Sequence, residues 1–359
     1  MLPHFSGLIT LKLPARFIKP LTDRRDHRQQ CDKIVIMDFS QQRLRDLALR
    51  WFDPAGLPGN FRICTDTTDF FRVDYNDVLI LNEHPYLVRG NAKEGRFGID
   101  DEPKFWVKRS TDLLDGSKKM IKLVFNESFK ARVGPITFDC VRSPVKEARV
   151  LSVVRGHPNF MQGFSVADDS RNVVRIIDYI YGKNLPAFID SIRKDHEEYF
   201  YRYLPSILHA YVETVEAIKF LHENKEIHGD VRRDHIIIDE TTKRFRWIDF
   251  DFIFYHHENR FGYDIFGLGN ILIYLVGGGD IIAQQLRDER PDIFQRLTQD
   301  DMNIIFHNRV ANLKKVFPYI SDTLNYMLLH FAMGSETFYD DTGQFLDDLL
   351  KAESSLQET

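Results

Sequence analysis

The segment that most constrains this 359-residue chain is EIHGDVRRDHIIIDETTKRFRWIDFDF, residues 226–252. Two short apolar runs, Ile236–Ile238 and Phe245–Ile248, flank a polar turn, and this pattern predicts a tight β-hairpin. Asp230 stands before the first run, and Asp249 directly follows the second. Because a hairpin this short returns the chain to its starting edge, the sequence predicts that these two carboxylates lie at the same rim.

Two carboxylates that lie close together, each at the end of a strand or loop, can take two different roles in one reaction. One accepts a proton while the other holds a divalent cation. The alternative is that Asp230 and Asp249 are solvated turn residues, which is the usual meaning of a lone aspartate. Their joint occurrence on either side of a β-branched hairpin favours the chemical interpretation.

The pattern of strands and helices changes along the chain. KFWVKRSTDL and KKMIKLVF flank an Asp-Gly turn at Asp115–Gly116, which is a hairpin signal. A helix is expected over Ser143–Val154, with Ser143 as its N-cap and Pro144 at its first position. Beyond about Leu185 the pattern is helical. Strands with one helix, followed by helices, predict an α+β chain with two lobes in tandem.

We therefore divide the chain into four predicted parts. Residues 1–36 are rich in basic side chains and are expected to form a disordered tail upstream of Met37, which is a candidate for the true start. Residues 37–77 form an accessory segment with an amphipathic helix and a strand. The β-rich N-lobe is expected over 78–182, and the helical C-lobe over 183–359.

Composition excludes several classes of protein. The formal net charge of −5 argues against a protein that coats DNA, because phosphate binding needs a clustered positive excess. Cys31, Cys64 and Cys140 are scattered, which excludes a disulfide scaffold and suits a reducing compartment. The most apolar stretch, Ile265–Gly279, is too short to span a bilayer. We expect a cytoplasmic protein without nucleic-acid or membrane partners, and its oligomeric state stays open.

Several motifs, taken in order, resemble the protein kinase-like superfamily over about residues 78–350. HGDVRRDH resembles the catalytic loop H-R-D-x-x-x-x-N, and Asp249-Phe250-Asp251 resembles D-F-G. MIKLVF resembles the third-strand lysine motif, KEARVLSVVRGHPNF the regulatory helix, IIDYIYGKNL the hinge, and YDIFGLGN a buried helix opened by Asp264. The resemblance is to a bacterial serine/threonine protein kinase-like domain with a divergent catalytic loop, and it implies a bilobal fold with a β-rich N-lobe.

The resemblance also implies roles for individual residues. Lys122 would contact the α- and β-phosphates of ATP, and Glu147 would pair with it. Asp249 would bind the metal that bridges the phosphates. Asp230 would orient and deprotonate the acceptor hydroxyl, and Arg232 would neutralise the γ-phosphate. These roles suit phosphoryl transfer, which needs mainly alignment and charge neutralisation. The alternative for Lys122 alone is a solvated strand lysine.

Further residues are implied as nucleotide contacts. Backbone groups of Asp178 and Ile180 would meet adenine at the hinge, and Ile237 would line the same site. Backbone amides freed by glycine can cradle phosphates. The candidate loop, RGNAKEGRFG, does not reproduce the spacing G-x-G-x-x-G, and a simple turn is the alternative for its glycines, which are Gly90, Gly95 and Gly98.

Two departures from the family pattern affect the metal. His235 stands where the family has Asn, and neutral imidazole suits Mn²⁺ or Zn²⁺ better than Mg²⁺. The alternative is that His235 only makes a hydrogen bond within the loop. Asp251 replaces the D-F-G glycine and is a further candidate ligand. The expected cofactors are ATP and Mg²⁺, with Mn²⁺ also allowed, and the candidate ligands are Asp249, His235 and Asp251.

Two other departures concern regulation. Gly229 replaces the Arg that clamps activation-loop phosphate in many kinases, and no Ser or Thr lies between Phe250 and Tyr263. We therefore expect an enzyme without a serine/threonine phosphorylation gate in this segment. The acceptor hydroxyl is left open. The hypotheses are a serine/threonine-type phosphotransferase, a small-molecule kinase of the same fold, and a pseudokinase that acts as a binding module.

Overall fold

The computed structural model describes residues 39–359, apart from 97–98, 134–135, 256–258 and 358–359. The predicted tail over 1–36 and the candidate Gly98 therefore lie outside the described residues. No helix in the described ranges is long and apolar enough to cross a membrane.

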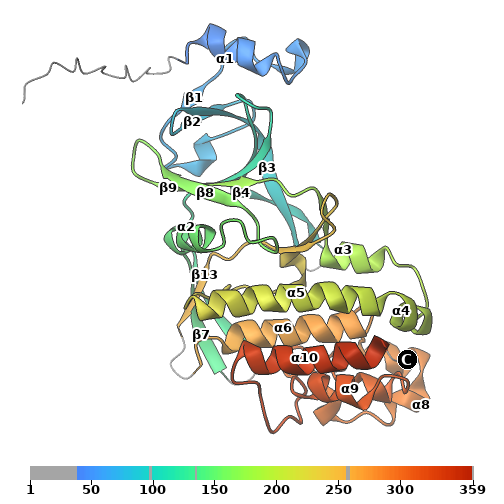
Figure 1. Cartoon of the computed structure of the whole chain (residues 1–359). Coiled ribbons are helices and arrows are strands. Elements are labelled where there is room, and N and C mark those ends of the chain that lie inside the picture. The colour runs from blue at the N-terminus through green and yellow to red at the C-terminus, as the bar shows by residue number, and fades with distance from the viewer. Residues whose placement is uncertain (1–38, 97–98, 134–135, 256–258, 358–359) are drawn as a thin grey trace, which may run out of the picture. The chain divides into compact units, whose positions relative to one another are not determined.

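A seven-stranded sheet forms the N-terminal half of the described chain, in the order β1-β2-β3-β4-β5-β9-β8 (Figure 1). Every neighbouring pair is antiparallel except β1 with β2. The β4–β5 hairpin confirms the Asp-Gly turn, and Gly116 has a φ of 76°. The strands of the sheet are β1 (Ile63–Cys64), β2 (Val78–Leu81), β3 (His84–Arg96), β4 (Ile99–Asp112), β5 (Lys118–Lys122), β8 (Gly163–Ala167) and β9 (Val173–Asp178).

The segment before β2 packs on this sheet. Helix α1 (Gln41–Ala48) begins after the N-cap Ser40, and its apolar face is buried against Val78 and Leu87 of the sheet. The indole of Trp51 donates a hydrogen bond to the carbonyl of Leu113. The expected helix is thus confirmed. Phe70–Arg72 form a 3-10 turn capped by Asp69, and β2 begins at residue 78.

Helix α2 (Pro144–Val153) follows Ser143, whose hydroxyl accepts a hydrogen bond from the Lys146 N–H, and it packs on β8 and β9. The capped helix is confirmed. Between β5 and α2 the chain forms a hairpin that the sequence did not predict. Strands β6 (Ser128–Val133) and β7 (Ile136–Arg142) join β13 (Phe252–Tyr255) in a three-stranded sheet of order β13-β7-β6.

The rest of the chain is mostly helical, and α5 (Leu204–Glu223) is its central element, packed against α4, α6, α10 and β12 (Figure 1). A third sheet contains β10 (Gly182–Asn184), β11 (Ile236–Asp239) and β12 (Phe245–Trp247), which confirms the predicted β11–β12 hairpin. The α+β, bilobal, kinase-like fold is confirmed. The other helices are α3 (Leu185–Asp190), α4 (His196–Arg202), α6 (Gly262–Val276), α7 (Ala283–Glu289), α8 (Pro291–Phe294), α9 (Asp322–Leu329) and α10 (Thr342–Gln357).

Candidate active site

A cleft of about 380 Å³ is lined by six of the candidate site residues, which are Lys122, Asp178, Ile180, His235, Ile237 and Asp249. Its apolar walls come from the seven-stranded sheet on one side and from β11 and the end of β12 on the other, with Val107, Met120, Ile177, Ile237 and Ile248. Its charged end is lined by Lys104, Lys122, His235 and Asp249. A flat apolar slot that opens onto a charged end suits a ligand with an aromatic ring and an anionic group.

Lys122 lies at the centre of the charged end. Its Nζ is 2.5 Å from Glu147 Oε1, 2.7 Å from Asp249 Oδ1 and 3.6 Å from Asp251 Oδ2. Burial alone would lower the pKa of Lys122, but the carboxylates, Asp249 foremost, raise it above its ordinary value. The ammonium is therefore permanently charged. Because Lys122 ends β5 and Glu147 lies in the first turn of α2, their contact fixes that helix against the sheet.

Asp249 directly follows the short hairpin and adopts a φ of 59°, in the left-handed region that non-glycine residues rarely occupy. Besides Lys122, its carboxylate meets the Lys104 ammonium at 3.3 Å. Burial would raise the pKa of Asp249, but Lys122, Lys104 and His235 hold it well below its usual range. The carboxylate thus stays ionised at the mouth of the cleft, where it can face a cation.

The loop that carries Asp230 is held from behind by Asp264 on α6. The Asp264 carboxylate accepts hydrogen bonds from the N–H groups of His228 and Gly229, at 2.7 and 2.8 Å, and from His222. Burial raises the pKa of Asp230 above its ordinary value. A carboxylate with a raised pKa is a stronger proton acceptor, which suits a general base.

Arg232 lies beside Asp230, with its Nε 3.9 Å from Asp230 Oδ1. Its guanidinium also donates to both carboxylate oxygens of Asp234. Asp234 itself lines the cleft. The structure therefore brings Arg232 to the same side of the cleft as Asp230.

His235 presents one ring nitrogen to the cleft. Its Nδ1 lies 2.9 Å from the carbonyl oxygen of Asp230, so Nδ1–H donates there and Nε2 is the ring nitrogen that faces Asp249. That Nε2 is 3.8 Å from Asp249 Oδ2. A nitrogen lone pair and an ionised carboxylate that face one another fit a divalent cation between them.

Within the described ranges, no group of three or more His, Cys, Asp or Glu side chains forms a complete metal centre. A magnesium ion usually keeps several waters and takes only one or two carboxylates, together with substrate phosphates. The pair Asp249 and His235 fits such a partial site. Asp251 is only 1% exposed and is bonded to Arg142, so its carboxylate is already engaged by a cation.

Two of the candidate glycines, Gly90 and Gly95, lie within β3. Gly90 is not among the described residues that line the cleft. At Gly90 a side chain would meet the Arg109 guanidinium at 3.1 Å, so this glycine makes room for an arginine. The wall of the cleft at this point presents Lys93 and Lys104 instead.

The predicted hinge residues lie at the cleft. Asp178, Tyr179 and Ile180 line the cleft, and Ile237 of β11 lies among its walls. The N–H of Asp178 donates to the Gln162 carbonyl, and its carboxylate meets the Lys119 ammonium of β5 at 2.6 Å. The start of the hinge is therefore tied both to β5 and to the residue that precedes β8.

A line of buried apolar side chains runs behind the site. The rings of His228 and Phe250 are 5.9 Å apart in an edge-on arrangement, and Leu151 of α2 belongs to the same core cluster as Phe250. Burial lowers the pKa of His228 to about 3, so its ring is neutral. This line joins α2, the Asp230 loop and the segment after Asp249.

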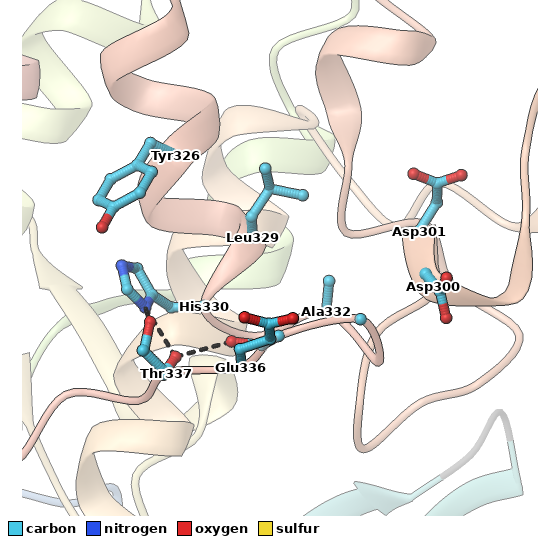
Figure 2. Close-up of a pocket in the computed structure, with 10 residues that line it drawn as sticks. Asp300, Asp301, Tyr326, Leu329, His330, Ala332, Glu336 and Thr337 are labelled. Atoms are coloured by element: carbon cyan, nitrogen blue, oxygen red, sulfur yellow. Dashed lines mark hydrogen bonds between the residues drawn. The ribbon is translucent and has the colours of Figure 1, made fainter.

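A second hollow, of about 270 Å³, lies among the C-terminal helices (Figure 2). Its Asp301 carboxylate has structural partners, since it accepts hydrogen bonds from Lys315 and from the N–H of Thr298. His330 is bonded to Thr337 (Figure 2). We assign this hollow no chemistry, and its exposed rim supplies control positions such as Glu336.

The fold and the site together define a bilobal, protein-kinase-like chain. A putative ribosomal protein S6 kinase alpha-2 of Caenorhabditis elegans is 26% identical over 148 residues, which is 41% of this chain and 17% of that protein. The serine/threonine-protein kinase CLA4 of Saccharomyces cerevisiae is 28% identical over 108 residues, 30% of this chain and 12% of that protein. A probable serine/threonine-protein kinase KIN1 homolog of Encephalitozoon cuniculi is 25% identical over 139 residues, 39% of this chain and 23% of that protein.

The chain spans less than a quarter of the length of each of these curated relatives. No model of a known protein family matches it. All three relatives are named as protein kinases, and the chain resembles protein kinases in these segments and in its bilobal fold.

The sequence did not reveal three cations around the site. Lys104 faces Asp249 from β4, Arg142 faces Asp251 from β7, and Lys146 lies inside the core beside Glu147. Lys104 gave no signal, since it lies three positions before Val107 and residues three apart on a regular strand point to opposite faces. Arg142 also gave no signal, because it lies on the β6–β7 hairpin, which no turn motif in the sequence predicts.

Gly229 is expected to be intolerant of any side chain. Its φ is 82°, and an added Cβ would lie 2.0 Å from the carbonyl oxygen of Phe252. We predict that Gly229→Ala lowers the free energy of unfolding by about 1–3 kcal/mol through backbone strain and displacement of β13. Denaturant unfolding measures this. Gly56→Ala is the matched control, since a Cβ there meets nothing within 4 Å, and an equal loss in both variants would contradict the prediction.

Proposed function

We propose that this chain is an ATP-dependent phosphotransferase that moves the γ-phosphate to a hydroxyl, of the serine/threonine protein kinase type. The observation that carries the proposal is the pairing of Lys122 with both Glu147 and Asp249 in a cleft that also holds the Asp230 loop. The names of the three relatives favour a protein hydroxyl as the acceptor.

In this proposal the apolar walls hold the adenine ring, with the backbone of Asp178 and Ile180 at its polar edge. Lys122 neutralises the α- and β-phosphates, and Lys104, which also faces Asp249, adds a second ammonium. Charge neutralisation by fixed cations costs little reorganisation when the phosphoryl group moves.

Asp249 and His235 would hold a divalent cation, Mg²⁺ or Mn²⁺, whose charge helps to neutralise the phosphates. Asp230 accepts the proton of the acceptor hydroxyl, and its buried carboxylate is suited to that task by its raised pKa. Arg232, held by Asp234, stands beside it to balance the charge that develops on the transferred group.

Two alternatives have specific support. The short stretch between Asp249 and α6, without Ser or Thr, offers little peptide-docking surface and favours a small-molecule hydroxyl. The irregular spacing of the candidate glycines, and the histidine at position 235, favour a pseudokinase that binds nucleotide without transfer.

The deciding experiment has two stages. Thermal shift with ATP and Mg²⁺ or Mn²⁺ asks whether nucleotide stabilises the fold by mass action. Turnover of γ-labelled ATP is then measured with a protein extract and, separately, with a pool of hydroxylated metabolites. Label in protein supports the proposal, and label only in metabolites supports the small-molecule alternative. A shift without any transfer establishes the pseudokinase, and no shift at all rejects nucleotide binding.

The residue at position 235 is expected to set the metal preference. In His235→Asn an amide oxygen replaces a nitrogen, and oxygen ligands favour Mg²⁺. We predict that the ratio of turnover with Mg²⁺ to turnover with Mn²⁺ rises by about tenfold, since a single ligand change is worth about this factor. His209→Asn, on the exposed side of α5, is the matched control. An unchanged ratio would assign His235 to a hydrogen bond within the loop.

A further inference from the structure

The segment that follows Asp249 is fastened to the hairpin before α2. β13 pairs antiparallel with β7, in a register that places Phe252 opposite Arg142 and Tyr255 opposite Asp139. The same hairpin runs directly into Ser143, the N-cap of α2. A backbone ladder therefore links the stretch after Asp251 to the helix that carries Glu147.

Arg142 connects this ladder to the site. Its Nη1 donates to Asp251 Oδ2, and its Nε donates to Glu127 at 3.2 Å. The guanidinium lies 4.3 Å from the centre of the Phe252 ring. The next N–H along the chain, that of Ser143, donates to the Asp251 carbonyl at 2.7 Å. Asp251 is thus bonded through both its side chain and its backbone by two consecutive residues.

The negative charge of the buried Asp251 carboxylate is compensated by the Arg142 guanidinium. The Asp251 side chain is 1% exposed, and within the described residues its Oδ1 has no hydrogen-bond partner. A buried carboxylate without a cation is strongly unfavourable. The other nearby cation is Lys122, 3.6 Å away, which is already shared by Glu147 and Asp249. Without Arg142, Asp251 would compete with Asp249 for Lys122.

Lys146 fastens the same segment from inside the core. Its Nζ donates to the carbonyl oxygens of Phe250 at 2.6 Å and of His228 at 2.7 Å, and the side chain is almost fully buried. An added Cβ at Gly229 would lie 3.5 Å from this Nζ and would clash with the β13 backbone. The glycine therefore makes room for the β13 backbone next to this ammonium.

We propose that Arg142 and Lys146 are positioning residues that hold the Asp249–Phe250–Asp251 segment against α2, so that the site is assembled without phosphorylation of the segment after it. The inference rests on the proposed phosphotransferase function. In many kinases, a phosphate bound by the catalytic-loop arginine orders the segment after the metal-binding aspartate. In this chain, we assign that role to two fixed side chains and a backbone ladder.

The test is a double-mutant cycle on Arg142 and Asp251. Arg142→Met keeps an apolar side chain over Phe252 but leaves the buried Asp251 carboxylate without its arginine partner. We expect kcat to fall about 100-fold, as for a displaced catalytic group, with KM for ATP changed less than about threefold. The double variant Arg142→Met with Asp251→Gly removes both charges. We expect its kcat to be at least about tenfold higher than that of Arg142→Met alone. Lys146→Met should also lower kcat with little change in KM.

The matched control is Arg149→Met, which removes an arginine from α2 whose partner is Glu226. We expect no change in kcat for this control, and none for wild type treated with a phosphatase. Loss of turnover after phosphatase treatment, or no recovery in the double variant, would overturn the inference while leaving the phosphotransferase function intact. If wild type transfers no phosphate, the proposed function fails. Hydrogen exchange over 249–255 then decides the inference, since Arg142→Met must speed exchange there and Arg149→Met must not.

Discussion

Asp230→Asn is expected to lower the rate of phosphoryl transfer by about 100- to 10,000-fold, the range that a general base contributes. The amide is nearly the same size as the carboxylate but does not accept the proton of the acceptor hydroxyl. The loop itself should keep its shape, because it is held by Asp264 and not by the Asp230 side chain. The stabilisation that ATP gives in a thermal shift should therefore persist.

The pH profile separates this role from a structural one. Burial raises the pKa of Asp230, so in wild type kcat/KM should fall as the pH drops through a value above that of an ordinary aspartate. In Asp230→Asn this acid limb should disappear along with most of the rate. Glu336→Gln, at the hollow of Figure 2, is the control for the loss of one carboxylate. Full turnover by Asp230→Asn would exclude Asp230 as the base.

The parts of the fold that could be predicted from the sequence are those with a local physical signal. The Asp-Gly hairpin, the Ser143 cap and the β11–β12 hairpin each depend on a few adjacent residues, and all three are present. The β6–β7 hairpin has no such signal. It is held by pairing with β13, which is far away in sequence and has the register Phe252 opposite Arg142. Long-range pairing of this kind leaves no local pattern.

The same distinction applies to the site. Lys122, Glu147, Asp230 and Asp249 lie in short motifs whose order along the chain is informative, and the structure brings these residues to one cleft or its border. Sequence could not show how charges are shared. Asp251 is a candidate metal ligand because it replaces the D-F-G glycine, and its contact with Arg142, on an unpredicted strand, could not be predicted from the sequence.

Lys122→Met is expected to remove turnover and to destabilise the fold at the same time. The ammonium is shared by Glu147 and Asp249 in a nearly water-free site. Removal of one partner from a buried ion pair leaves an uncompensated charge, which costs about 3–5 kcal/mol. We therefore expect a marked fall in the melting temperature, and turnover below about 1% of wild type, because the phosphates lose their principal cation.

A second variant separates the two effects. In Lys122→Met with Glu147→Gln one negative charge leaves together with the positive one. Arg175, which bonds the native Glu147 carboxylate at 3.0 Å, keeps a polar partner in the amide oxygen that replaces it. The melting temperature should then recover toward wild type, since neutral groups replace the stranded charge. Turnover should not recover, because ATP still meets no amine at position 122. If turnover returned along with stability, Lys122 would be a structural lysine, and the cleft would need another residue for the phosphates.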